Sequence, residues 1–169
     1  MRKLDIEKLN PNYFVFELDE SHFDNVYELY LGNKEYFEVV PPMVTIDTPK
    51  KDMLALPPNK TYEDKYYLGM YEFGLLLCVV DLIIDYPKKG SAFIGLFMIQ
   101  KVYQNHGIGS EIITNLLKAL SMQGVKEVKV GVVEKNIKAM NFWKKNGFFD
   151  TGIVSKEELY DVKILVKEL

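Results

Sequence analysis

The 169 residues are enough for one domain with a sizeable hydrophobic core, and we expect a single domain over residues 1–169. Apolar residues make up 48% of the chain and charged residues 27%, as in ordinary soluble globular proteins. The net charge of −3 argues against nucleic acid as a main partner, because phosphate-binding surfaces normally carry a basic excess.

The sequence offers no metal site, no disulfide and no membrane segment. Two histidines and the single cysteine, Cys78, lie far apart and form no metal-ligand pattern. The longest apolar run, Leu75–Val80, is too short to cross a bilayer, and Met1–Asn10 lacks the apolar stretch of a signal peptide. We therefore expect a cytoplasmic protein that binds neither a metal nor a membrane.

The first third of the chain predicts one strand followed by helices. Aromatic and branched residues favour a strand over Tyr13–Leu18. Ser21 and Asp24 resemble a capping box, and the helix that follows should end at Gly32–Asn33. Two further short helices are expected, over Lys34–Val39 and Thr48–Leu54.

Three strands with tight turns follow and predict an antiparallel meander. They are expected over Tyr66–Phe73, Leu75–Ile84 and Phe93–Ile99, with turns at Gly74 and Tyr86–Gly90. The last run is almost wholly apolar, which suits a strand buried on both faces.

Helical spacing replaces this pattern over Ile108–Met122, where apolar residues recur three and four positions apart. The next strand, marked by the alternation of Val128, Val130 and Val132, must then lie parallel to the third. Asn136 is a good N-cap for a second helix, which Gly147 ends. A final hairpin is expected from Phe148–Val154 and Asp161–Val166.

The turn before the first of these helices has the features of an anion site. Gly107 and Gly109 allow a sharp turn and a close approach to the backbone. The first helical turn offers unpaired N–H groups and a positive dipole end, which suit a pyrophosphate. Gln104, His106 and Ser110 could add side-chain donors.

Two other phosphate motifs fit this turn less well. A Walker loop needs Gly-Lys-Ser/Thr at the start of the helix, and none is present. A dinucleotide fingerprint needs a third glycine, where Ile112 stands, although Glu134 suits a ribose-binding acid. A nucleotide-binding oxidoreductase therefore stays as a minor alternative, and it predicts NADH binding.

The chain carries two motifs that together resemble those of the GNAT superfamily of acyl-CoA-dependent N-acetyltransferases. Gln-x-x-Gly-x-Gly over Gln104–Gly109 is similar to the pyrophosphate motif of that family. Asn-x-x-Ala-x-x-Phe-Trp-x-x-x-Gly-Phe over Asn136–Phe148 is similar to its next strand–helix motif. The resemblance implies an α/β (α+β) fold with a mixed, mostly antiparallel twisted sheet. Helices should cover both faces, and a central parallel strand pair should splay apart for CoA.

The resemblance also implies acetyl-CoA as co-substrate, no metal, and an amine acceptor that is a small molecule or a protein amine. The amine attacks directly in a ternary complex, and a homodimer stays open. The cofactor residues implied are Phe97, Met98, Ile99, Gln104, Asn105, His106, Gly107, Ile108, Gly109, Ser110, Asn136, Ala139, Phe142 and Trp143.

The resemblance also implies a backbone N–H near Met98 that would polarise the thioester carbonyl. For the general base, the sequence itself offers Asp81 as the leading candidate. Asp81 is the only charge within the apolar run Leu75–Ile84. The alternative is a structural carboxylate satisfied by backbone or a tyrosine at a sheet irregularity. Glu134 is a second candidate for the base.

Trp143 departs from the family pattern, because many members carry a tyrosine there that protonates the leaving thiolate. An indole donates a hydrogen bond but is no practical proton source. Either another of the eleven tyrosines reaches the site, or the thiolate leaves without an acid. Trp143 then packs near the thioester or is a core aromatic. A non-catalytic acyl-CoA-binding or sensor module is the competing interpretation.

The proline-rich stretch Val40–Lys60 also has two interpretations. It is a connecting loop, or, as the resemblance implies, a wall of the acceptor pocket.

Overall fold

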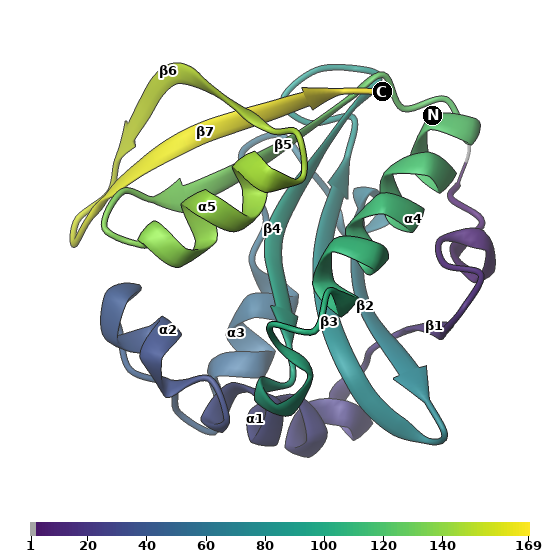
Figure 1. Cartoon of the computed structure of the whole chain (residues 1–169), viewed down its shortest axis with the longest axis vertical. Helices are drawn as coiled ribbons and strands as arrows, with labels where there is room; N and C mark the ends of the chain where they lie inside the picture. The colour runs from purple at the N-terminus through teal and green to yellow at the C-terminus, as the bar shows by residue number, and fades with distance from the viewer. Residues whose placement is uncertain (1–2) are drawn as a thin grey trace.

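A seven-stranded twisted sheet runs through the computed structural model, which describes residues 3–169 (Figure 1). The strand order is β1-β2-β3-β4-β5-β7-β6, and among these neighbours only β4 and β5 run parallel. The predicted mixed, mostly antiparallel sheet is confirmed. The strands are β1 Phe14–Glu17, β2 Lys65–Glu72, β3 Leu75–Ile84, β4 Ser91–Ile99, β5 Glu127–Val133, β6 Phe149–Lys156 and β7 Asp161–Glu168.

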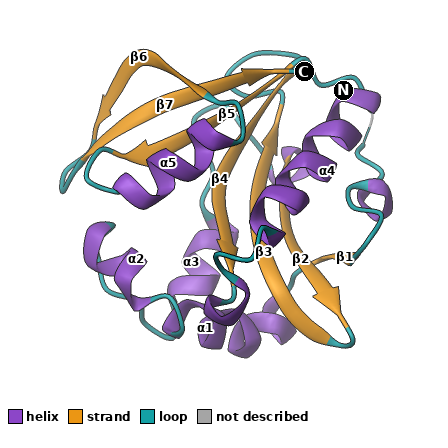
Figure 2. Ribbon diagram, in the orientation of Figure 1, coloured by secondary structure: helices purple, strands orange, loops and turns teal. Residues whose placement is uncertain are grey.

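Helices cover both faces of this sheet, as predicted. In Figure 2, α4 and α5 lie in front of the strands, whereas α1, α2 and α3 gather at the lower end of the view. None of the helices described over residues 3–169 is long and apolar enough to cross a membrane. No signal peptide was predicted in Met1–Asn10, and the first two residues of that stretch lie outside the described residues. The helices are α1 Phe23–Leu31, α2 Lys34–Val39, α3 Thr48–Leu54, α4 Ile108–Met122 and α5 Ile137–Lys145.

The capping box predicted at Ser21 and Asp24 is wrong by two residues. Asp19 is the N-cap, and its carboxylate accepts a hydrogen bond from the Ser21 N–H at 2.9 Å. The His22 ring closes the box by accepting from the Asp19 N–H at 3.2 Å. The aspartate begins a short 3-10 turn, Glu20–His22, and α1 continues from it.

Apolar side chains form one cluster on each face of the sheet. The larger cluster packs under α4 and contains Ile112 and Leu116, both fully buried. The other packs under α1 and contains Val26 and Tyr30, also fully buried. Successive residues of β4 serve both clusters, because alternate side chains of a strand point to opposite faces.

The parallel pairing of β4 and β5 covers only their first halves. The register runs from Ser91 opposite Glu127 to Ile94 opposite Val130 and then stops. At that point Gly95 is an extra residue in β4, since Asp81 pairs with Leu96 and its neighbour pairs with Ile94. A bulge of this kind bends its strand, and Figure 2 shows β4 and β5 diverging.

The bend also exposes part of β4, so the prediction of a strand buried on both faces is wrong at its centre. Gly95 is exposed, and Leu96 and Phe97 are half-buried. On one side Leu96 and Phe97 still pair with β3, but on the other side they border the gap that β5 leaves.

A buried ion pair lies directly behind the bulge. The Lys65 ammonium donates to Asp81 Oδ2 at 2.8 Å and to the Ala55 carbonyl at 2.9 Å, which ties β2 to β3 and to the end of α3. Both side chains are almost fully buried. Burial raises the pKa of the Asp81 carboxyl, and the Lys65 charge opposes that rise.

Replacing Lys65 with methionine should destabilise the fold by about 3–5 kcal/mol at pH 7, because the Asp81 carboxylate would stay buried without its partner. The pKa of Asp81 is raised in the folded protein. Protonation should therefore restore stability as the pH falls through that pKa. Urea unfolding at several pH values measures both effects.

Lys88→Met is the matched control, because Lys88 pairs with Glu127 at the surface and its loss should cost at most about 1 kcal/mol. Adding Asp81→Asn to Lys65→Met should recover most of the lost free energy of unfolding, because no unpaired charge would then stay buried. Equal stability of the two lysine variants would contradict a structural role for the buried pair.

Candidate functional site

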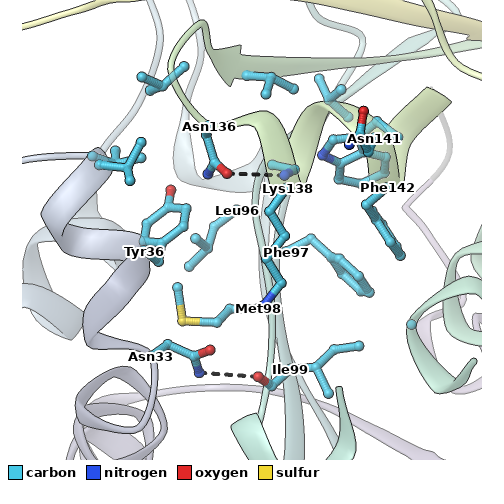
Figure 3. A pocket seen from close by; sticks show the side chains of 18 of the residues that line it. Asn33, Tyr36, Leu96, Phe97, Met98, Ile99, Asn136, Lys138, Asn141 and Phe142 are labelled. Atoms are coloured by element: carbon cyan, nitrogen blue, oxygen red, sulfur yellow. Dashed lines mark hydrogen bonds between the residues drawn. The ribbon is translucent and has the colours of Figure 1, made fainter. Parts of the chain in front are cut away.

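A cavity of about 780 Å³ opens where β4 and β5 part. It is bounded by α2, β4, the loop before α4, β5 and α5. Figure 3 shows the Phe97 and Phe142 rings on one side of the β4 backbone, and Leu96, Met98 and Tyr36 on the other. One strand therefore presents side chains to two halves of the same space.

The direction of the β4 backbone groups follows from two hydrogen bonds. The Gln100 N–H donates to the Leu77 carbonyl of β3, so backbone groups two residues earlier, at Met98, also point toward β3. The Ile99 carbonyl points the other way and accepts from Asn33 at 3.1 Å. Phe97 and Ile99 thus direct their backbone groups toward the gap.

This direction does not suit the polarising role expected of the Met98 N–H, because that group faces β3. Phe97 offers the neighbouring N–H that faces the gap. The sequence could not distinguish the two, because the extra residue at Gly95 changes which strand positions face outward.

The glycine loop has the backbone shape that its residues predicted. Gly107 is the N-cap of α4 with φ +82°, and a Cβ there would meet no atom within 4 Å. The helix ladder begins with the Glu111 N–H donating to the Gly107 carbonyl. The N–H groups of the first turn have no partner in the helix and lie at the edge of the cavity, which Gly109 and Ser110 line.

Close packing explains why residue 109 is a glycine. A Cβ at this position would lie 2.9 Å from Ile99 Cδ1 and 3.1 Å from Phe142 Cε2. The start of α4 therefore approaches β4 and α5 more closely than any other residue would allow. This approach brings the anion site beside the free edge of β4.

Gln104 connects three walls of the cavity through its side-chain amide. Its Nε2 donates to Asn33 Oδ1 at 2.6 Å and to the Ile99 carbonyl at 3.0 Å. Its Oε1 accepts from Lys138 Nζ at 2.8 Å. Gln104 lines the cavity, but a bond from it to a pyrophosphate would require this network to rearrange.

Aromatic rings close the α5 side. Phe97 stacks on Phe142 with ring centroids 5.6 Å apart, and Trp143 packs between Phe142 and Phe148. Trp143 is 6% exposed, and that small surface borders the cavity. Its position thus combines the two roles that the sequence left open, a core aromatic and a wall of the site.

The remaining predicted residues divide into two groups. Asn136 caps α5 by accepting from the Ala139 N–H at 3.0 Å, and Asn136, Ala139 and Asn105 all line the cavity. His106 is exposed and Ile108 packs against the core, and neither is among the lining residues.

Asp81 and Glu134 also lie outside the lining of the cavity. The Asp81 carboxylate lies behind Gly95, where a Cβ would be 3.0 Å from Oδ2. This arrangement favours a structural carboxylate at a sheet irregularity, with a lysine as its partner, and the base role stays a prediction.

Residues at the start of α2 and the lysines of the cavity were not predicted from the sequence. Asn33 and Tyr36 line the cavity although no motif marks them. Lys135, Lys138 and Lys145 also line it, against one acid, Glu35, whose charge is paired with Lys101. The excess of positive charge suits a polyphosphate ligand.

Comparison with known proteins agrees with this geometry. The Acetyltransferase (GNAT) family pattern matches residues 23–148. A probable spermine N(1)-acetyltransferase of Bacillus subtilis subsp. natto (strain BEST195) is 29% identical over 115 residues, which cover 63% of this chain and 74% of that protein.

Solved structures share the fold at low sequence identity. An acetyltransferase from Thermus thermophilus has a TM-score of 0.72 and 17% identity, over 94% of this chain and 97% of that one. The PaiA N-acetyltransferase from Thermoplasma acidophilum, in complex with coenzyme A, has a TM-score of 0.66 and 17% identity, over 93% and 99% of the two chains. The chain belongs to the GNAT acetyltransferase family and is an acetyl-CoA-dependent N-acetyltransferase.

Proposed function

We propose that acetyl-CoA lies across the cavity with its pyrophosphate at the glycine loop and its pantetheine arm along the free edge of β4. The observation that carries this proposal is the opening of the α4 N-terminus and the unpaired edge of β4 into one cavity. The helix start supplies N–H groups and a positive dipole to the pyrophosphate. Lys138 and Lys145, which line the same cavity, add charge.

The pantetheine arm takes the place of a neighbouring strand along the free edge of β4. Phe97 directs both of its backbone groups toward the gap, and amides of the arm can pair with them. The Ile99 N–H is a further donor, whereas the Ile99 carbonyl already accepts from Asn33 and Gln104. The Phe97 N–H donates to the thioester carbonyl and stabilises the negative charge that develops on its oxygen during attack. Phe142 and Trp143 exclude water on the far side.

The acceptor that we propose is an alkyl polyamine. The first support is the name of the relative from Bacillus subtilis, a probable spermine N(1)-acetyltransferase. The second is an acidic group on the α1–α3 side of the sheet. The Asp52 carboxylate accepts from the Tyr30 hydroxyl at 2.8 Å and lies near enough to Tyr36 and Tyr160 to contribute to the raised pKa of both.

A polyamine carries several amine groups. The one that attacks must be neutral, while the others stay charged as ammonium groups. Asp52 can hold a charged one by an ion pair in a partly buried setting, where the attraction is stronger than in water. Burial raises the pKa of the Asp52 carboxyl, and the Tyr30 hydrogen bond opposes this, which helps the carboxylate to stay ionised.

Changing Gly107 to glutamate should abolish acetyl-CoA binding, because a carboxylate would occupy the anion site. Gly74→Glu is the matched control, since Gly74 has φ +79° and equally open surroundings but lies in the β2–β3 turn. Both variants should lose about 1–2 kcal/mol of stability through left-handed backbone strain. Calorimetric titration that finds wild-type affinity in Gly107→Glu would refute the phosphate role.

Spermine should release free CoA from acetyl-CoA at a saturable rate, with acetylspermine as product. Asp52→Asn should raise the KM for spermine at least tenfold, because an ion pair is lost, and leave acetyl-CoA affinity unchanged. Asp24→Asn on the exposed surface of α1 is the control. Thiol detection and mass spectrometry follow the reaction. Absence of spermine-dependent release would overturn the polyamine proposal, and an unchanged KM would remove Asp52 from it.

A further inference from the structure

The reaction needs a proton for the CoA thiolate, and Trp143 stands where the resemblance led us to expect a tyrosine. Among the described residues that line the cavity, Tyr36 is the only tyrosine, and no histidine or cysteine is present. Ser110 is too weak an acid to take this role. Three lysines line it too, of which Lys138 bonds to Gln104, and Tyr36 supplies the phenol that the resemblance led us to expect.

The Tyr36 hydroxyl is placed for contact with a ligand. Figure 3 shows it projecting from α2 into the cavity, opposite Asn136. It forms no hydrogen bond with any described residue, whereas the Tyr30 and Tyr67 hydroxyls bond to each other at 2.9 Å. The residue as a whole is half-buried, and a hydroxyl without a protein partner at a cavity wall is free to bond with a substrate.

The ring of Tyr36 is held in place from two sides. It packs edge-on against Phe37, with centroids 5.1 Å apart, and against the cluster that contains Met98. The start of α2 is fixed by Asn33, whose amide bonds to the Ile99 carbonyl. Tyr36 is therefore anchored to the β4 segment along which the thioester is proposed to lie.

We propose that Tyr36 is the general acid that protonates the departing CoA thiolate. The amine nitrogen attacks the carbonyl carbon, and a tetrahedral intermediate forms. Its C–S bond then breaks with the electron pair moving to sulfur, which takes the hydroxyl proton of Tyr36. The resulting phenolate recovers the proton that the amine nitrogen loses, so the products are the N-acetyl amine and CoA thiol.

This step rests on acetyl transfer by the family and not on the identity of the acceptor. Burial raises the pKa of the Tyr36 hydroxyl, so the group stays protonated at neutral pH. Because a phenolate is a stronger base than a thiolate, the hydroxyl proton passes to sulfur only as the amine nitrogen, made acidic by its new bond to the acyl carbon, returns a proton to the Tyr36 oxygen.

Tyr36→Phe should lower kcat about 100-fold with unchanged acetyl-CoA affinity, the size typical of a lost general acid. A solvent deuterium isotope effect on kcat in the wild type should change in this variant. Adding Trp143→Tyr should recover at least tenfold in kcat, because it supplies a phenol from α5. Tyr62→Phe, at an exposed tyrosine outside the cavity, should behave as the wild type.

A kcat within twofold of wild type would overturn the proposal. So would an effect confined to the KM of the acceptor, which would make Tyr36 a binding residue. If the double variant does not fold, the isotope effect decides, and an unchanged value contradicts the acid role. If spermine is not acetylated, the acceptor proposal fails separately. The same variants are then compared in the acceptor-independent hydrolysis of acetyl-CoA, where the same thiolate leaves.

Discussion

The extra residue at Gly95 is the constraint on which the rest of the site depends. It turns β4 away from β5 after four paired positions and leaves a strand edge without a neighbour in the middle of the sheet. Unpaired backbone groups normally make such an edge unfavourable inside a fold. Here they border a cavity that suits an extended ligand, and the buried Lys65–Asp81 pair supports the bend from behind.

The other parts of the site are arranged around this edge. Gly109 lets the start of α4 approach it, and Gln104 joins it to α2 and α5. The side chains on the two faces of β4 then meet different parts of the site. The aromatic rings of α5 lie on one face, and Tyr36, which we propose as the acid, lies on the other. A tryptophan at position 143 is thus compatible with catalysis, because a phenol can reach the same space from the opposite side.

Much of the fold followed from local pattern. The limits of α2, α3 and α4 and the parallel strand pair were predicted correctly, because periodicity, proline and glycine act locally. The glycine loop was also marked by its residues. The direction of the β4 amides was not predictable, because one bulge residue reverses it. Tyr36 and Asn33 carry no motif, and only the packing of α2 against β4 brings them to the site.

The most direct test is residue-resolved hydrogen exchange of the β4 amides, measured by NMR with and without acetyl-CoA. We predict that the Met98 amide is protected in both states, because it faces β3. The Phe97 and Ile99 amides should exchange quickly in the free protein and become protected when acetyl-CoA binds, with no change on adding NADH. Phe97 and Ile99 amides that are already protected, or that acetyl-CoA leaves unchanged, would contradict the account.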